Sequence, residues 1–391
     1  MTPVFRRWYI SRQRSINNVE SRLEQSSGKQ MQKIKFRLRG DHVDSFARLG
    51  ELRAVFLDLT NRCGLSCKYC FNRRALQSAP LDLDPGLIDK ALRSKLGESV
   101  KYWYLSGGEP LLYSHLPEVL RLFQERGVGP KVATNGILAT PEVLDAWVGA
   151  GVRSVQFSLD TLDPGLQAYL NGGGKEDLET ILSNLAHAVR SPLRVVVSSV
   201  LTGMNRREIK DIMAFCFRSG VDSYTLYPNV PSEPLHQELI VPFPELLALM
   251  DELFSVYSSL CPTRVIDMTV PCFSQSPVYA KWKDILALRF HGCSAAQYAL
   301  KITSGGRVSA CICQDTEPFI IGDLRTDGLD DIWVSEKAHS FRSLYKKIPE
   351  CVACSQADVC RGGCRNNASL HGAQGLASLD PYCQFFKSRI E

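Results

Sequence analysis

The sequence predicts an α/β fold in which a parallel sheet is followed by a small cysteine-rich domain. Between residues 53 and 227, short apolar runs of strand length alternate with amphipathic stretches of helix length. Six such units in succession favour a parallel sheet whose crossover helices lie on its outside. Beyond Cys293 this alternation stops, and eight of the fourteen cysteines lie between residues 293 and 383. We therefore expect a second part of the chain that is organised by metal.

Each expected element follows from the spacing of its apolar residues. A functional site on a parallel sheet lies at the carboxyl ends of the strands, so the residues that directly follow each strand are the candidates. The expected strands are 53–59, 101–105, 130–134, 153–159, 194–201 and 221–227, and the expected helices are 84–95, 115–126, 141–149, 175–189, 205–218 and 243–258.

Composition divides the chain into four segments: a basic arm (1–50), the sheet-forming part (51–260), a connector (261–290) and the cysteine-rich part (291–391). Residues 1–40 carry ten Lys/Arg and two acidic residues, which leaves the rest of the chain close to neutral. Because residues 41–391 are close to neutral, we do not expect a broad surface that binds nucleic acid. The arm, in which we expect a helix near 14–24, also overlaps in composition with a mitochondrial presequence.

The pattern of apolar residues also bears on the compartment. No hydrophobic signal segment opens the chain, and no run of eighteen apolar residues crosses it. We therefore expect no membrane association and a reducing, cytoplasmic setting. Reduced cysteines favour metal binding over disulfides.

The most informative motif is a loop of three cysteines that follows the first expected strand. Cys63, Cys67 and Cys70 have the spacing C-x3-C-x2-C, and Tyr69 precedes the last of them. Three thiolates hold three irons of a cubane cluster and leave the fourth iron open to a small molecule. The alternative is a zinc knuckle, but zinc sites favour paired cysteines, and no Cys or His follows Cys70 until His115.

This loop resembles the signature of the radical S-adenosylmethionine (SAM) enzymes. The resemblance implies a partial (βα)6 barrel and a [4Fe–4S] cluster whose open iron chelates SAM. It also implies that SAM is cleaved to a 5′-deoxyadenosyl radical, which abstracts hydrogen from a substrate. An external electron donor of flavodoxin or ferredoxin type would reduce the cluster.

Polar residues at the ends of the next three strands complete this resemblance. Gly-Gly-Glu-Pro follows the second strand, and its two glycines allow a ligand to approach the backbone closely. Taken singly, this motif and the polar strand ends are also typical of turns and helix caps. The basic residue often found about ten positions after the aspartate at 160 is missing here. The resemblance implies a SAM-binding set made of Tyr69, Gly107, Gly108, Glu109, Thr134, Ser158 and Asp160.

The C-terminal cysteines form a second motif, which resembles the seven-cysteine SPASM domain. That domain carries two auxiliary [4Fe–4S] clusters, so we expect three clusters in all. A zinc ribbon built on the C-x2-C pair is the alternative. The resemblance implies that the outer cluster is bound by Cys351, Cys354, Cys360 and Cys383, and the inner cluster by Cys293, Cys311 and Cys364.

The fourth ligand of the inner cluster is open. Relatives often carry a cysteine five or six positions before the residue that matches Cys293, where this chain has Ala287 and Leu288. The candidates are Cys272, which we favour, Cys313, His291 and an open iron. A hairpin with a Gly-Gly turn at 302–308 is expected to bring Cys293 and Cys311 together, and Cys216 and Cys261 are expected to be packed thiols.

The resemblance predicts a radical SAM oxidoreductase that modifies a peptide or protein, as in ribosomal peptide maturation. The first 50 residues are too few for the leader-binding module of many relatives, so a separate leader-peptide-binding protein could supply it. The alternatives are a dehydrogenase of a small molecule such as an aminocyclitol or sugar, and a non-enzymatic iron–sulfur electron carrier. Ile312 stands where sulfatase-maturing relatives have a catalytic aspartate, which disfavours that activity. No catalytic residue is assigned from the sequence.

Overall fold

The computed structural model describes residues 51–229, 237–260, 265–268, 276–282 and 292–383. Within these residues a sheet of ten strands runs in the order β10-β9-β8-β1-β2-β3-β4-β5-β6-β7. Neighbouring strands from β1 to β7 pair in parallel, which confirms the predicted parallel sheet. The strands are β1 (Ala54–Thr60), β2 (Tyr102–Gly107), β3 (Lys131–Thr134), β4 (Ser154–Ser158), β5 (Arg194–Leu201), β6 (Ser223–Pro228), β7 (Val265–Met268), β8 (Ala299–Ile302), β9 (Arg307–Ser309) and β10 (Ile320–Asp323).

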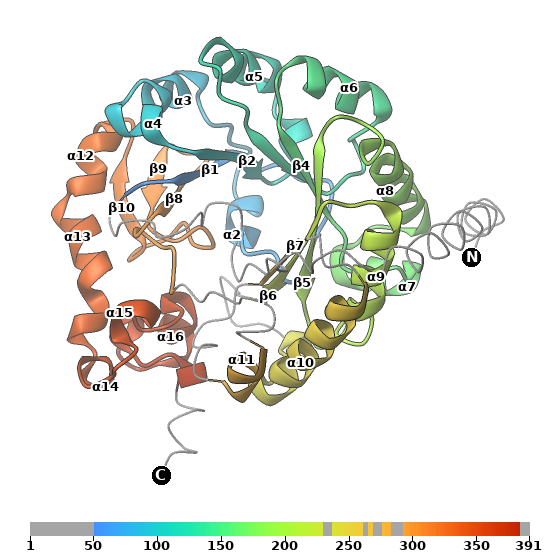
Figure 1. The fold of residues 1–391 in the computed structure, drawn as a ribbon. Coiled ribbons are helices and arrows are strands. Elements are labelled where there is room, and N and C mark those ends of the chain that lie inside the picture. Colours follow the sequence, from blue (N-terminus) through green and yellow to red (C-terminus); the bar gives the residue numbers. More distant parts are fainter. Residues whose placement is uncertain (1–50, 230–236, 261–264, 269–275, 283–291, 384–391) are drawn as a thin grey trace, which may run out of the picture. The chain divides into compact units, whose positions relative to one another are not determined.

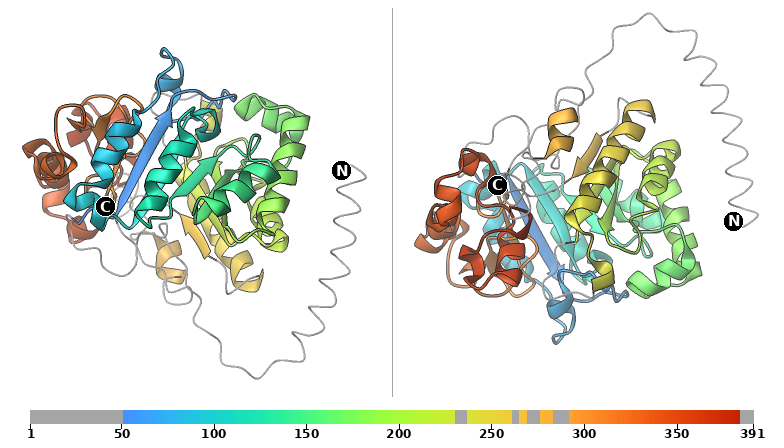
Figure 2. Two further views of the ribbon diagram at one scale, coloured as in Figure 1. Left: turned by 90° about the horizontal axis from the view of Figure 1, so that it is seen from above. Right: turned by 90° about the horizontal axis from the view of Figure 1, so that it is seen from below.

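Helices surround the strands, so that the sheet forms the inner layer of an open barrel (Figures 1 and 2). This arrangement confirms the partial barrel that was expected. The helices of the barrel are α2 (Arg73–Leu76), α3 (Pro85–Leu92), α4 (Lys95–Ser99), α5 (Leu116–Glu125), α6 (Pro141–Gly149), α7 (Pro164–Asn171), α8 (Lys175–Ala188), α9 (Ile209–Ser219), α10 (Phe243–Leu260) and α11 (Pro277–Trp282). The C-terminal helices are α12 (Leu329–Val334), α13 (Glu336–Ser343), α14 (Pro349–Val352), α15 (Ala357–Cys360) and α16 (Arg365–His371).

Alternation along the strands decides which side chains face the helices and which face the barrel interior. Trp103 of β2 is almost fully buried and packs edge-on against Phe123 of α5, with ring centroids 5.6 Å apart. Burying each such side chain contributes about 1.5–3 kcal/mol, so this layer holds helices and sheet together. The side chains that face the barrel interior include polar ones: Asp58 of β1 lies in register with Ser106 of β2, and both line the interior cavity. The barrel therefore has an apolar outer layer and a partly polar interior.

Two expected helices differ from the structure for local reasons, and helix α7 was not expected. The predicted helix 84–95 ends at Leu92, and α4 begins after Ser94, whose hydroxyl caps it by accepting a hydrogen bond from Gly97 N. The predicted helix 205–218 begins later, at Ile209, since residues 202–205 form a hydrogen-bonded turn instead. Helix α7 was not predicted, although the Asp163 N-cap followed by Pro is a recognisable start signal.

The cysteine-rich part extends the barrel sheet. Strands β8 and β9 form the predicted antiparallel hairpin with a Gly-Gly turn. Strand β8 also pairs in parallel with β1, and Phe56 lies in register with Lys301. No local pattern predicted this pairing, which joins the two parts of the chain.

The segment boundaries remain a prediction. Within the expected connector 261–290 the structure describes β7 and α11. The basic arm with its expected helix, Cys261, Cys272 and His291 lie outside the described residues. Helix α9 carries Cys216 fully buried, as was expected of a packed thiol.

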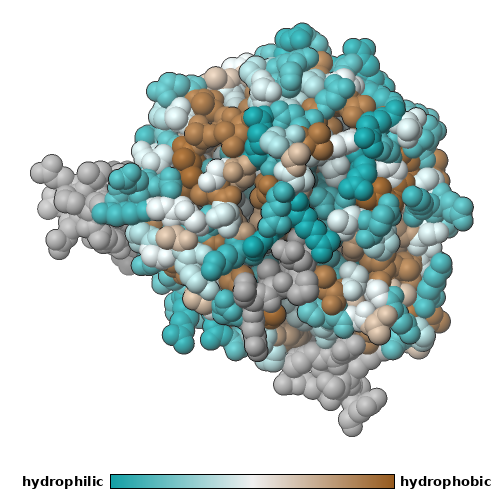
Figure 3. Space-filling view, turned by 180° about the vertical axis from the view of Figure 1, so that it is seen from behind, coloured by the Kyte–Doolittle hydropathy of each residue, from teal (hydrophilic) through white to brown (hydrophobic). Residues whose placement is uncertain are grey.

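None of the described helices is both long enough and apolar enough to cross a membrane. On the face shown in Figure 3, hydrophilic and hydrophobic residues are interspersed.

Candidate active site

A cavity of about 370 Å³ opens inside the barrel and reaches both groups of cysteines. Its walls include inward-facing polar residues from successive strands, among them Asp58, Ser106, Gln156, Ser198 and Thr225. Cysteines line it from two parts of the chain: Cys63, Cys67 and Cys70 from the three-cysteine loop, and Cys293, Cys311, Cys313, Cys360 and Cys364 from the C-terminal part. The fold thus places one enclosed space between the two predicted groups of metal ligands.

The three-cysteine loop (residues 61–70) follows β1, as predicted, and is held by backbone hydrogen bonds to helix α7. Ser66 N donates to Asn171 O at 2.9 Å, and Lys68 N donates to Leu170 O at 2.8 Å. The loop therefore takes its position from the end of a helix more than a hundred residues away. Asn171, which stands where a basic residue was expected, also lines the cavity.

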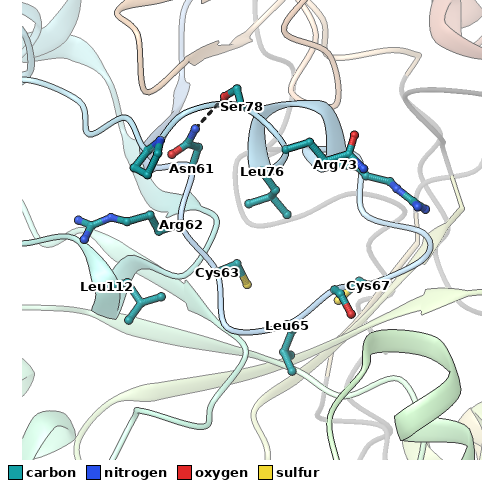
Figure 4. Close-up of a pocket in the computed structure, with 12 residues that line it drawn as sticks. Asn61, Arg62, Cys63, Leu65, Cys67, Arg73, Leu76, Ser78 and Leu112 are labelled. Atoms are coloured by element: carbon teal, nitrogen blue, oxygen red, sulfur yellow. Dashed lines mark hydrogen bonds between the residues drawn. The ribbon is translucent and has the colours of Figure 1, made fainter.

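Asn61 fixes the start of this loop, a role that the sequence analysis missed. Its amide nitrogen donates to Ala75 O, Ala79 O and the Ser78 hydroxyl at 2.8–2.9 Å, and its amide oxygen accepts from Leu81 N at 2.7 Å. Figure 4 shows Asn61 and Ser78 at one side of a second pocket, of about 420 Å³, which Cys63 and Cys67 also line. The loop is thus accessible from its outer side as well as from the barrel cavity.

Tyr69 and Asp160 connect the loop to the far side of the barrel. The Tyr69 hydroxyl donates a hydrogen bond to Asp160 Oδ2, and both residues are buried. The other carboxylate oxygen accepts from Val200 N at 2.6 Å. Burial raises the pKa of Asp160 to about 6, while these hydrogen bonds act to lower it. Both predicted residues line the cavity.

The two glycines of the Gly-Gly-Glu-Pro motif are required by close backbone packing. Gly107 has φ 120°, and a Cβ there would lie 2.5 Å from Thr60 O. A Cβ on Gly108 would lie 2.1 Å from Arg62 O. The backbone of this motif is hydrogen-bonded to the residues before Cys63, since Gly108 N donates to Thr60 O at 2.7 Å. The glycines therefore position the three-cysteine loop, and both border the cavity.

Glu109 is buried behind residues that line the cavity, and its expected contact with SAM remains a prediction. Glu109 is 1% exposed and is not among the described residues that line the cavity. Its carboxylate accepts hydrogen bonds from the Thr134 hydroxyl and from Asn135 N, each at 2.8 Å. Burial raises the pKa of Glu109, and these donors oppose the rise. Thr134 and Asn135 themselves line the cavity, so Glu109 holds residues that face a ligand.

Ser158 lies at the carboxyl end of β4, where the sequence placed it. Its side chain is exposed and borders the cavity. It is therefore available to a ligand, in contrast to Glu109.

The C-terminal cysteines influence one another electrostatically within the two sets that the resemblance implied, and the assignment of these sets to two clusters remains a prediction. Burial, helped by the charges of Cys354, Cys360 and Cys383, raises the pKa of Cys351 to about 11. These four cysteines are the outer set. Burial raises the pKa of Cys364 as well, and there Asp380, Cys293 and Cys311 add to the effect. Cys293, Cys311 and Cys364 are the inner set.

Cys313 lies next to the inner set. Its backbone N–H donates to Cys311 Sγ at 3.4 Å, and its side chain lines the same cavity as the three cysteines of that set. It is the candidate fourth ligand that falls within the described residues.

The donor sets fit iron–sulfur clusters better than single metal ions. Among the described residues, no three Cys, His, Asp or Glu side chains lie close enough together to bind one ion. A cubane spreads its thiolates over its corners and so needs a wider arrangement than tetrahedral zinc does. Buried thiols with raised pKa values become thiolates when they bind metal.

A buried guanidinium that has two nitrogen atoms without hydrogen-bond partners among the described residues supports the same conclusion. Arg365 is 4% exposed and donates through Nη1 to Leu376 O and Ser378 O. Its Nε and Nη2 atoms are buried and have no hydrogen-bond partner among the described residues. Its charge acts to lower the pKa of Cys351, which burial raises. Unpaired buried donors are rare, and an anionic cluster at the outer set would supply acceptors for them.

Sequence reasoning missed Asp58, Lys301 and Arg365. Each carried a signal: Asp58 and Lys301 are charged residues within apolar strand sequences, and Arg365 directly follows a cysteine of the motif. Charged residues are rarely buried unless they are paired, so a charge in a core strand marks a partner elsewhere.

Comparisons with known proteins agree with this geometry. Residues 57–216 match the model of the radical SAM superfamily, and residues 293–355 match that of an iron–sulfur cluster-binding domain, SPASM. The chain is 26% identical to the PqqA peptide cyclase of Xanthomonas oryzae pv. oryzae over 85% of its own length and 87% of the relative's. It is 25% identical to the tungsten-containing aldehyde ferredoxin oxidoreductase cofactor-modifying protein of Pyrococcus furiosus over 79% of the chain and 89% of that protein.

Among solved structures, SuiB of Streptococcus suis bound to S-adenosylmethionine has the same fold. The TM-score is 0.68 at 18% identity, over 85% of this chain and 78% of SuiB. This likeness concerns the fold alone.

Proposed function

Since the chain belongs to the radical SAM superfamily and carries a C-terminal SPASM domain, we propose that it oxidatively modifies a peptide. Its cofactors are [4Fe–4S] clusters and S-adenosylmethionine. One observation carries the proposal: the three-cysteine loop and the inner set line a single cavity. When bound, the clusters and SAM supply hydrogen-atom abstraction and an acceptor for the second electron. A substrate in this cavity would lie between the three-cysteine loop, where hydrogen abstraction starts, and the inner set, where the second electron is accepted.

The residues around the cavity divide into those that face a ligand and those that hold them. Thr134, Asn135 and Ser158 border the space next to the three-cysteine loop and present hydroxyl and amide groups to SAM. Glu109 orients the first two through its carboxylate. Gly107 and Gly108 keep the backbone close to the loop.

Tyr69 and Asp160 act on the opposite side of the same space. Their hydrogen bond ties the three-cysteine loop to the ends of β4 and β5. A loop fixed at both sides keeps the predicted ligands Cys63, Cys67 and Cys70 in one arrangement, as a preorganised site requires.

The kind of substrate is inferred from the relatives. The PqqA peptide cyclase aligns with most of this chain and is named for a peptide substrate. A peptide is therefore the substrate class that we propose. A separate leader-binding protein and a flavodoxin-type or ferredoxin-type electron donor are the proposed partners.

A second candidate is a small molecule. The Pyrococcus furiosus relative, which aligns over a similar length, is named for the modification of a cofactor. A cavity of about 370 Å³ is within the range of small-molecule sites. This alternative uses the same residues and differs only in the substrate.

The test is a reaction with candidate substrates under anaerobic conditions. Reconstituted protein would be incubated with SAM, dithionite and either a short peptide encoded beside its gene or small molecules of neighbouring pathways. We expect release of 5′-deoxyadenosine and loss of two hydrogens from the peptide, detected by mass spectrometry. Loss of hydrogen from a small molecule alone would favour the second candidate. A protein that does not bind SAM would instead be an electron carrier, and the proposal would fail.

A further inference from the structure

Lys301 is a buried cation at the junction between the barrel and the cysteine-rich part. It is 1% exposed and belongs to β8, which pairs with β1 of the barrel. A lysine is almost never fully buried unless its charge is paired. We therefore expect the Lys301 ammonium to have specific polar partners, and we ask what a buried charge contributes at this position.

The partners of Lys301 come from the barrel. Its Nζ atom lies 3.3 Å from Asp58 Oδ2 and donates a hydrogen bond to Asn72 Oδ1 at 3.1 Å. The Asn72 amide nitrogen in turn donates to Gly107 O at 3.1 Å. Lys301 thus connects β8 to Asn72, which lies two positions after the three-cysteine loop. Asn72 in turn connects Lys301 to Gly107 of the Gly-Gly-Glu-Pro motif.

The charge on Lys301 is stable in this environment. Burial is the largest single effect and disfavours the ammonium, but the negative charges of Asp58, Asp315 and Cys313 together outweigh it, so the pKa of Lys301 is raised above its ordinary value. Burial also raises the pKa of Asp58, and the ammonium acts in the opposite direction. We therefore treat Lys301 as a permanent positive charge at neutral pH.

This charge lies close to cysteines of both groups in the fold. Its hydrogen-bond acceptor Asn72 follows Cys70, the last cysteine of the three-cysteine loop, by two positions. On the other side, Lys301 is in register with Ser309 of β9, whose hydroxyl accepts a hydrogen bond from Cys311 N at 3.3 Å. A single buried ammonium therefore lies between the backbone segments that carry Cys70 and Cys311.

We propose that Lys301 is a positioning residue that makes the clusters at the three-cysteine loop and at the inner set easier to reduce, while it holds the loop against β8. Reduction adds negative charge to a cluster, and a nearby buried cation favours that state. Asp58 has the opposite effect on the loop. This inference rests on the proposed function for the presence of the clusters, and it does not depend on the identity of the substrate.

The experiment is a redox titration of the reconstituted, substrate-free protein, followed by electron paramagnetic resonance. In Lys301→Met we expect the potentials of the catalytic and inner clusters to shift to more negative values. In Asp58→Asn we expect the catalytic cluster to shift to more positive values. The outer cluster serves as an internal reference and should not move in either variant.

Two further variants act as controls. Lys90 also reaches across the junction, since its Nζ donates to Leu324 O at 2.7 Å, and this hydrogen bond goes to a backbone carbonyl that is far in sequence from Cys70 and Cys311, the nearest members of the two cysteine groups. Lys90→Met should leave all three potentials unchanged. Arg365→Gln should shift the outer cluster, since the Arg365 charge acts on Cys351, and should leave the catalytic cluster unchanged.

Lys301→Met leaves the buried Asp58 without its partner, so this variant can fail to fold. The double variant Asp58→Asn/Lys301→Met removes both charges and keeps the inference testable. In it, the inner cluster should still shift to a more negative potential.

Unchanged catalytic and inner potentials in an iron-replete Lys301→Met protein, or an unchanged inner potential in the double variant, would overturn the inference. An equal shift of the outer cluster would do the same. A wild-type protein that binds no iron would instead overturn the proposed function.

Discussion

The Tyr69 hydroxyl donates a hydrogen bond to the Asp160 carboxylate across 91 positions of sequence. Both residues are buried, and both border the cavity that the three-cysteine loop and the inner set share. The residue beside Cys70 is therefore fixed by the end of a distant strand. A local motif thus depends on the assembled barrel for its geometry.

We expect Tyr69→Phe to destabilise the protein by about 1–3 kcal/mol, because a buried carboxylate oxygen loses its donor. It should also reduce the release of 5′-deoxyadenosine. Urea unfolding and a cleavage assay would measure the two effects. Tyr113→Phe is the matched control: Tyr113 is also buried and donates to Leu83 O at 2.5 Å, but it does not border the cavity. If both variants cleaved SAM equally well, the positioning role of Tyr69 would be wrong.

The pKa of Asp160, raised by burial to about 6 from 3.8, predicts a pH dependence of stability. The folded state holds this proton more tightly than the unfolded chain does. The stabilisation that protonated Asp160 gives to the folded state is therefore complete below about pH 4 and is lost as the pH rises to about 6. A shift of this size corresponds to roughly 3 kcal/mol.

Asp160→Asn should remove this dependence. The free energy of unfolding of the wild type, measured relative to Asp160→Asn, should fall between pH 4 and pH 7. Asp380, whose pKa burial also raises to about 6, is present in both proteins and cancels from the difference. Parallel pH profiles would show that Asp160 has an ordinary pKa.

Substitution of Gly108 by alanine should disrupt the three-cysteine loop. The added Cβ would lie 2.1 Å from Arg62 O, so the backbone before Cys63 must move. Overpacking of this kind costs about 1–3 kcal/mol. We expect reduced iron binding by the loop, measured as iron content after reconstitution. Gly149→Ala, where a Cβ meets nothing within 4 Å, should retain wild-type iron content.

Iron content tests the assignment of the three clusters. Reconstituted protein should hold about twelve irons and the same amount of sulfide. The variant in which Cys63, Cys67 and Cys70 are all replaced by alanine should keep about eight irons. A preparation from oxygen-free, iron-replete cells that contained zinc alone would contradict the cluster assignment.

The fourth ligand of the inner cluster can be decided between Cys313 and Cys272. Cys313 shares the cavity with the inner set, so we expect Cys313→Ala to change the paramagnetic resonance signal of that cluster while SAM cleavage is retained. Cys216→Ala, in the buried face of α9, should leave the signal unchanged. A change in Cys272→Ala and none in Cys313→Ala would favour Cys272, the ligand expected from the sequence.

The sequence by itself determined the elements and the chemistry of the motifs. Strand β5 was predicted with its exact bounds, since its apolar run is local and bounded by turns. The Gly-Gly-Glu-Pro motif was placed correctly at the end of β2 for the same reason. The resemblance to the SPASM domain divided the seven C-terminal cysteines into two sets, and this division remains a prediction.

Tertiary structure alone decided which of these residues line the cavity and which charged residues are buried close to it. The Glu109 carboxylate accepts hydrogen bonds from Thr134 and Asn135, which are 25 and 26 positions away in the sequence. Lys301 meets Asp58 only because β8 pairs in parallel with β1. Periodicity reports on neighbours within one element, whereas the pairing of distant strands depends on the free energy of the whole fold. The buried ion pair between the two cysteine groups was therefore beyond the reach of sequence patterns.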